Sequence, residues 1–109
     1  YNLVDLNLSQ DERSALVEFY SEHSPANHQD KTVVIAKWLK DVKGIDEVNK
    51  DIVFTVLRTL GESTSFNISQ ALVNAKNLKS FFVSTEAGKF KINHIGEDHV
   101  DRDLVGKDK

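Results

Sequence analysis

The sequence of 109 residues contains no cysteine, which excludes disulfides, cysteine-ligated zinc sites and thiol nucleophiles. It also has no long apolar run: no apolar stretch exceeds four residues. Such runs are far too short for a membrane span or for the core of a signal peptide. We therefore expect a domain without a membrane partner. The missing cysteine fits a reducing compartment, so we expect a cytoplasmic location.

Methionine is absent as well, and the chain begins at Tyr1. A native start codon normally leaves a methionine or a small residue at this place. We therefore expect the sequence to be one domain of a longer protein, divided from the rest at a domain boundary.

Motifs of known catalytic chemistry are also missing. The sequence has no nucleophile elbow, no P-loop and no dinucleotide-binding glycine motif. No two of its four histidines have the i, i+4 spacing of a helical metal site. The acidic pairs Asp46/Glu47 and Glu97/Asp98 fall at expected loops or helix starts, where capping explains them. We therefore expect neither an enzyme nor a metal or other cofactor.

The composition is typical of one soluble globular domain, with 39% hydrophobic and 28% charged residues. We expect this domain to span residues 9–104 and to be followed by a frayed tail at 105–109. Residues 1–8 alternate apolar with polar side chains, which indicates an extended segment packed on the domain. A linker remnant explains the same eight residues equally well.

Four amphipathic helices are predicted from apolar residues at helical spacing and from the residues at the helix ends. Ser9, Asn27 or His28, Asn49 and Asn67 are the expected starts, and His23, Gly44 and Gly61 are the expected ends of the first three. Capping boxes are expected for Ser9 with Glu12 and for Asn67 with Gln70. Trp38 is predicted to lie in the core, with a partner surface shared with Tyr20 as the alternative. The inward faces are predicted to hold Ala15, Leu16, Phe19, Tyr20, Val34, Ile35, Trp38, Leu39, Val42, Ile52, Val53, Val56, Leu57, Leu60, Ile68, Ala71, Leu72, Ala75 and Leu78.

The pattern changes after the fourth helix to one that is typical of strands. Residues 81–85 are aromatic and β-branched, and residues 90–93 alternate apolar with polar side chains. The turn at 86–89 joins them into a β-hairpin, and a short helix is expected over Glu97–Leu104. The predicted fold class is mostly α with a small β-hairpin, built from four to five helices and two strands.

Two helices joined by a short turn and followed directly by a hairpin resemble the winged-helix (winged helix-turn-helix) superfamily. The resemblance covers roughly residues 50–100. Much of it lies in Gly88–Val100, which reads as a strand, a polar pair, a glycine and an amphipathic helix. In such a domain the two earlier helices complete the bundle and the hairpin is a two-stranded wing. The resemblance implies duplex DNA binding, with helix 67–79 in the major groove and hairpin 81–93 on the backbone or in the minor groove.

The residues of this helix and hairpin have the chemistry that such an interface needs. Amide side chains read adenine, lysines contact phosphates, and an apolar side chain can touch the methyl group of thymine. A serine at the start of a helix suits a phosphate. The candidate nucleic-acid-binding residues are Ser69, Gln70, Val73, Asn74, Lys76, Asn77, Lys79, Lys89 and Lys91.

Charge is distributed unevenly along the chain, whose formal net charge is -3. Residues 1–66 hold eleven acidic and seven basic residues, whereas residues 67–95 hold four lysines and one glutamate. The net-basic segment coincides with the expected interface, which favours DNA binding. However, this segment lacks arginine, the commonest reader of guanine, and its lysines are equally suited to a solvated face or to protecting an edge strand. The alternative is therefore a non-catalytic protein-interaction module of winged-helix shape, in which Val73 contacts a protein partner or the parent protein.

Overall fold

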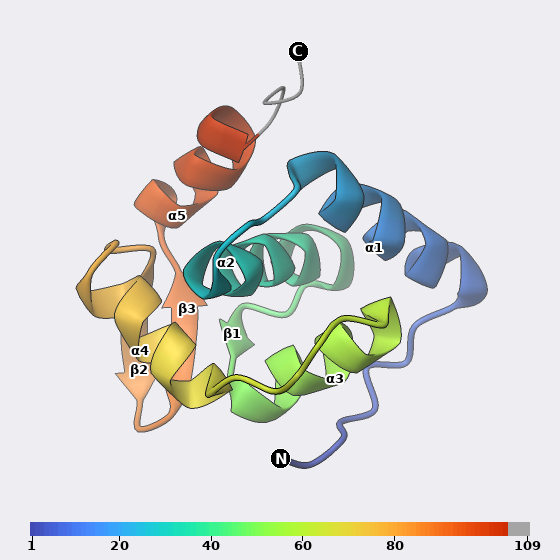
Figure 1. Ribbon diagram of the computed structural model, residues 1–109, viewed down its shortest axis with the longest axis horizontal. Coiled ribbons are helices and arrows are strands. Elements are labelled where there is room, and N and C mark those ends of the chain that lie inside the picture. Colours follow the sequence, from blue (N-terminus) through green and yellow to red (C-terminus); the bar gives the residue numbers. More distant parts are fainter. Residues whose placement is uncertain (105–109) are drawn as a thin grey trace.

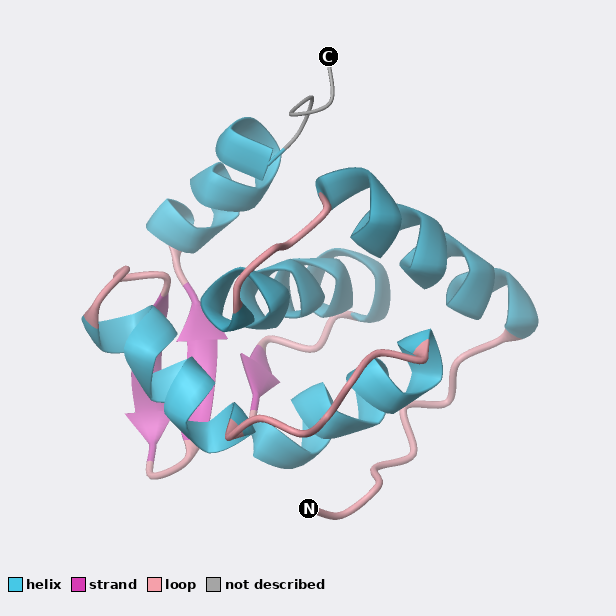
Figure 2. Ribbon diagram, viewed as in Figure 1, coloured by secondary structure: helices cyan, strands magenta, loops and turns pink. Residues whose placement is uncertain are grey.

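The computed structural model, which describes residues 1–104, is a bundle of helices with a small antiparallel sheet at one side (Figure 1). The predicted class, mostly α with a small β-hairpin, is confirmed (Figure 2). The tail predicted at 105–109 lies outside the described residues. No helix within the described part of the chain is long and apolar enough to cross a membrane. The elements in order are α1 (Gln10–His23), α2 (His28–Trp38), the π-helical turn η1 (Leu39–Lys43), β1 (Glu47–Val48), α3 (Lys50–Leu60), α4 (Ile68–Asn77), β2 (Phe82–Glu86), β3 (Lys89–Ile92), α5 (His94–Asp98) and the π-helical turn η2 (His99–Leu104).

The starts of the first four helices follow from local side-chain chemistry. Ser9 Oγ accepts a hydrogen bond from the Glu12 backbone N–H at 3.1 Å, and the Glu12 carboxylate accepts one from the Ser9 N–H at 2.9 Å. This reciprocal pair is the predicted capping box. Asn27, Asn49 and Asn67 each accept a hydrogen bond from the backbone N–H three residues further on. The predicted starts are therefore confirmed.

The last helix begins at His94, three residues before the predicted start at Glu97. Asn93 caps it, because the Asn93 side-chain oxygen accepts a hydrogen bond from the Gly96 N–H at 3.0 Å. Asn93 Nδ2 also donates to the Ser80 carbonyl at 2.8 Å. One side chain thus fixes both the start of α5 and the segment that precedes β2.

The sheet has the order β1-β3-β2, with both neighbouring pairs antiparallel. β2 and β3 form the predicted hairpin, in which Phe82 pairs with Ile92 and Ser84 with Phe90. Gly88 adopts a φ of 79° in the turn, which a side chain would disfavour. β1 adds a third strand that the sequence did not predict, and it pairs Glu47 with Lys91 and Val48 with Phe90.

The core is organised around α2, which lies between α1, α4 and α5 (Figure 1). Trp38 is only 2% exposed, so its predicted place in the core is confirmed. The alternative of a partner surface shared by Trp38 and Tyr20 is wrong, because Tyr20 is buried as well. Leu16 of α1, Val56 of α3 and Leu72 of α4 complete the same cluster.

Three residues predicted to face inward are exposed instead. The buried residues of α1 are Leu16, Tyr20 and His23, which turns Ala15 towards solvent. Val42 is exposed because it lies in η1, where the wider π-helical turn breaks the spacing that continues from α2. Leu78 is 72% exposed because α4 ends at Asn77, before the predicted stripe is complete.

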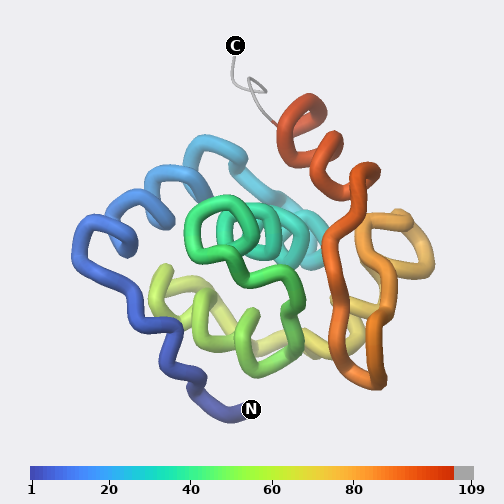
Figure 3. Tube along the Cα trace, turned by 180° about the vertical axis from the view of Figure 1, so that it is seen from behind, coloured from blue at the N-terminus to red at the C-terminus, as the bar shows by residue number. Residues whose placement is uncertain are grey.

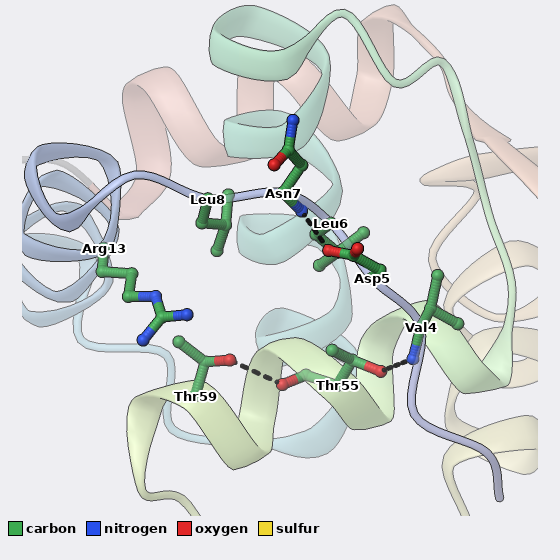
Figure 4. A pocket seen from close by; sticks show the side chains of 8 residues that line it. All are labelled: Val4, Asp5, Leu6, Asn7, Leu8, Arg13, Thr55 and Thr59. Atoms are coloured by element: carbon green, nitrogen blue, oxygen red, sulfur yellow. Dashed lines mark hydrogen bonds between the residues drawn. The ribbon is translucent and has the colours of Figure 1, made fainter.

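Residues 1–8 run along α3, as the view from behind shows (Figure 3). The Val4 backbone N–H donates to Thr55 Oγ1 at 2.9 Å, and Tyr1 Oη accepts from the Ile68 N–H at the start of α4 at 3.0 Å. A small cavity of about 270 Å³ remains between this segment, α3 and Arg13 (Figure 4). The segment therefore contacts both α3 and the first turn of α4.

Candidate nucleic-acid interface

The outer face of α4 carries amide side chains. Ile68, Ala71, Leu72 and Ala75 are buried against the core, which leaves the opposite side of the helix to polar residues. In contrast to the predicted reciprocal capping box with Asn67, the Gln70 side chain points along the helix: Gln70 Nε2 donates to Asn74 Oδ1 at 2.9 Å.

We call Gln70 and Asn74 the amide pair. Gln70 is exposed and Asn74 is half-buried. Asn77, one turn beyond Asn74, is exposed on the same side of the helix. The structure thus brings together the three amides of α4 that the sequence predicted as readers of bases.

The side of α4 that faces the hairpin borders a groove. The groove has a volume of about 230 Å³ and is lined by Lys50, Ser69, Leu72, Val73, Gly88 and Phe90. Ser69 and Val73 therefore lie next to the hairpin turn, in the arrangement that a joint interface of helix and hairpin requires. Val73, a predicted contact residue, is half-buried because it packs against the edge of the core.

The four predicted phosphate-binding lysines occupy three different places. Lys76 and Lys79 lie near and beyond the end of α4, at the other end of this helix from the hairpin turn. Lys89 follows the turn and forms a 3.6 Å ion pair with Glu86, in which both side chains are well exposed. Because Phe90 and Ile92 are buried towards the helices, Lys91 lies on the outer face of the sheet, away from α4.

Lys50 is a candidate that sequence reasoning missed. It is the first residue of α3, it is exposed, and it lines the same groove as Ser69 and Gly88. In the sequence it belongs to the acidic part of the chain, so a segment-by-segment sum of charge hides it. Its position at the start of the helix before α4 could have identified Lys50 as a candidate interface residue.

The cations of α2 and η1 are neutralised by nearby carboxylates. Lys31 pairs with Glu62 at 3.9 Å, and Lys43 pairs with Glu12 at 3.0 Å. In contrast, four lysines around α4 and the sheet form no ion pair with any residue in the range 1–104; they are Lys50, Lys76, Lys79 and Lys91. Arg13, Arg58 and Arg102 form no ion pair within this range either. Four of the seven unpaired cations therefore lie around α4 and the sheet, whereas α1 carries Arg13 alone and lies on the far side of the molecule (Figure 1).

A charge network joins α2 and η1 to α5 and η2. Lys37 contacts the carboxylates of Asp41 at 2.6 Å, Glu97 at 3.6 Å and Asp101 at 3.7 Å, while Lys40 pairs with Glu97 at 2.9 Å. Burial alone would lower the pKa of Lys37, but the three carboxylates outweigh it and raise this pKa. The hydrogen bond from Lys40 holds the pKa of Glu97 below its ordinary value, with a further contribution from Lys37.

Histidines do not assemble a metal site in the described part of the chain. His99 lies between two carboxylates, with Nε2 at 2.8 Å from Asp30 Oδ1 and Nδ1 at 2.9 Å from Asp103 Oδ2. Its ring also stacks on Phe81 at 4.5 Å. Residues 1–104 contain no group of three or more side chains that could hold a metal ion.

Comparisons with family models, curated proteins and solved structures gave no match to this chain.

Proposed function

We propose that this chain is a nucleic-acid-binding module of the winged-helix type that binds duplex DNA through helix 67–79 and hairpin 81–93. The observation that carries the proposal is the groove in which Lys50 of α3, Ser69 and Val73 of α4 and Gly88 of the hairpin turn meet. The element order α2-β1-α3-α4-β2-β3, with β1 paired to β3, supports it. A helix and a hairpin that share one surface can contact a groove and the adjacent backbone together.

The roles of the residues follow from their positions. The amides of α4 face outward, where an α-helix in the major groove reaches base edges. Lys50 and Lys89 flank the hairpin turn and are placed to contact phosphates of one DNA strand. Lys76 and Lys79, at the other end of α4, are placed to contact phosphates of the other strand. Lys91 faces away from α4 and contributes only to the general field.

The net negative charge of the protein is compatible with this proposal. The acidic α1 lies far from α4, so the dipolar charge distribution turns the lysine-bearing side towards DNA. Four lysine–phosphate contacts give a slope of about -3 to -4 for log affinity against log salt.

Fluorescence anisotropy with a labelled mixed-sequence duplex tests the proposal. We expect binding at low salt in the micromolar range or tighter, with the salt slope given above. The double variant Lys50→Gln/Lys89→Gln should weaken binding and reduce the slope by about 2, since each lost phosphate contact removes about 1.

A matched control removes the same charge elsewhere: Arg13→Gln/Arg102→Gln, at two exposed positions on α1 and η2. This variant should leave the salt slope unchanged. Equal losses in both double variants, or no binding by the unmodified protein at micromolar concentration, would refute the proposal.

A protein-interaction module of the same shape is the second candidate, and exposed apolar residues favour it. Leu78 after α4 is 72% exposed, and Val83 on the edge strand β2 is 48% exposed. Exposed apolar side chains near an unpaired strand edge are typical of contact surfaces. Light scattering that shows self-association lost in Leu78→Ser, together with absent DNA binding, would favour this candidate over the first.

A further inference from the structure

The amide pair of α4 presents a fixed combination of hydrogen-bonding groups. Gln70 Nε2 donates to Asn74 Oδ1 at 2.9 Å, which occupies one donor and one acceptor and restrains both side chains. The Gln70 side-chain oxygen remains an acceptor, while the second N–H of Gln70 Nε2 and the Asn74 Nδ2 group remain donors. The backbone below the pair is fixed as well, because the Gln70 N–H donates to Asn67 Oδ1 and the Asn74 carbonyl accepts from the Leu78 N–H.

The amide side chains of α4 offer both acceptors and donors to a base edge in the major groove. Adenine presents the N6 amino donor and the N7 acceptor there, and an amide side chain can pair with both. Guanine presents two acceptors, N7 and O6, and therefore needs two donors. Arginine is the usual residue for that task, and residues 67–95 contain none.

Val73 and Asn77 extend this surface. Val73 lies three residues after Gln70 and lines the groove beside Gly88, so its methyl groups flank the amide pair on the hairpin side. The partner of adenine is thymine, whose C5-methyl group projects into the major groove and suits an apolar contact. Asn77 is exposed one turn after Asn74 and offers a further amide to the next base pair.

Resting on the DNA binding proposed above, we infer that α4 selects A·T base pairs in the major groove, with Gln70 and Asn74 reading adenine and Val73 contacting the thymine methyl group. Discrimination of at least about fivefold against G·C is expected from one well-formed amide–adenine pair.

Anisotropy with three alternating 20-base-pair duplexes tests this inference: A·T, G·C and inosine·cytosine. Inosine·cytosine has the major-groove acceptors of G·C but the minor-groove edge of A·T, so it separates the two grooves. We expect the A·T duplex to bind at least about fivefold more tightly than both others. Replacing every thymine by uracil, which removes only the methyl group, should weaken A·T binding.

Two variants locate the preference on the protein. Asn74→Ala should reduce the A·T preference towards one while leaving G·C affinity nearly unchanged. Lys76→Gln on the same helix is the control, and it should weaken all three duplexes equally because a phosphate contact carries no sequence information. Circular dichroism of both variants checks that the total helix content is unchanged.

The outcomes separate this inference from the function on which it rests. Equal affinity for the three duplexes would overturn the A·T inference and leave DNA binding in place. Inosine·cytosine binding as tight as A·T would also overturn it, because recognition would then lie in the minor groove. No binding to any duplex would refute the proposed function itself.

Discussion

Gly96 provides the most sharply defined structural prediction, because a methyl group at this position has no room. A Cβ built on Gly96 would lie 2.6 Å from the Phe81 carbonyl oxygen, 2.8 Å from Ile92 Cγ1 and 3.1 Å from Val33 Cγ2. The Phe81 oxygen cannot yield easily, since it accepts a hydrogen bond from the Asn93 N–H at 3.0 Å. Gly96→Ala therefore has to push α5 away from α2 and from the hairpin.

The size of the effect follows from two opposing contributions. Overpacking of a tight contact costs about 1–3 kcal/mol, and the strained Phe81–Asn93 hydrogen bond adds about 1 kcal/mol. Replacing glycine by alanine inside a helix returns about 1 kcal/mol of intrinsic propensity. The net loss in the free energy of unfolding is about 2 kcal/mol, which for a domain of this size lowers Tm by roughly 10 °C.

Urea unfolding followed by the fluorescence of the buried Trp38 measures this loss. Gly88→Ala is the control, because a Cβ there meets no atom within 4 Å and the substitution costs only the positive φ. If Gly96→Ala is as stable as the unmodified protein, the close packing of α5 against Phe81 and Val33 is refuted.

Three further changes have defined outcomes. Tyr20→Phe should leave the free energy of unfolding unchanged or raise it by about 1 kcal/mol, because the buried Tyr20 hydroxyl has no hydrogen-bond partner within residues 1–104; a loss above about 1 kcal/mol in urea unfolding would contradict this. Asn93→Ala should cost about 1–2 kcal/mol in the same assay, because the side chain both caps α5 and holds the Ser80 carbonyl, and an unchanged midpoint would argue against this dual role. Lys40 and Lys37 lower the pKa of Glu97 below its ordinary value of 4.5, so ionised Glu97 stabilises the fold at pH values above 4.5. This stabilisation is lost as the pH falls through the lowered pKa. The urea midpoint should therefore fall less steeply between pH 6 and pH 3 in Glu97→Gln than in the unmodified protein.

Much of the helical architecture is readable from the sequence because it depends on neighbours along the chain. Ser9 with Glu12, Asn49 and Asn67 act within three residues, so their capping roles are visible in the letters. The same holds for the turn at Gly88, whose positive φ favours glycine.

Features that depend on distant parts of the chain were missed. β1 has only two residues, and its strand conformation comes from pairing with β3, which no local pattern encodes.

A local irregularity was missed as well. Val42 is exposed because the π-helical turn interrupts the regular spacing from which its burial was predicted.

The candidate site was predicted in part for the same reason. The amides of α4 share one face because their spacing is helical, and this could be predicted. The place of Lys50 beside Gly88 depends on how α3 packs against the hairpin. Lys50 was therefore counted with the acidic residues 1–66 and not with the net-basic segment 67–95. Conversely, alternation along β3 places Lys91 away from α4, although the two are close in the sequence.

An NMR titration of the isotope-labelled protein with duplex DNA tests the central claim most directly. We expect backbone shift changes concentrated on residues 67–79 and 86–91 and on Lys50, with side-chain amide changes for Gln70 and Asn74 and none along α1. A spectrum that does not change with added duplex, or changes confined to α1 and η2, would contradict it.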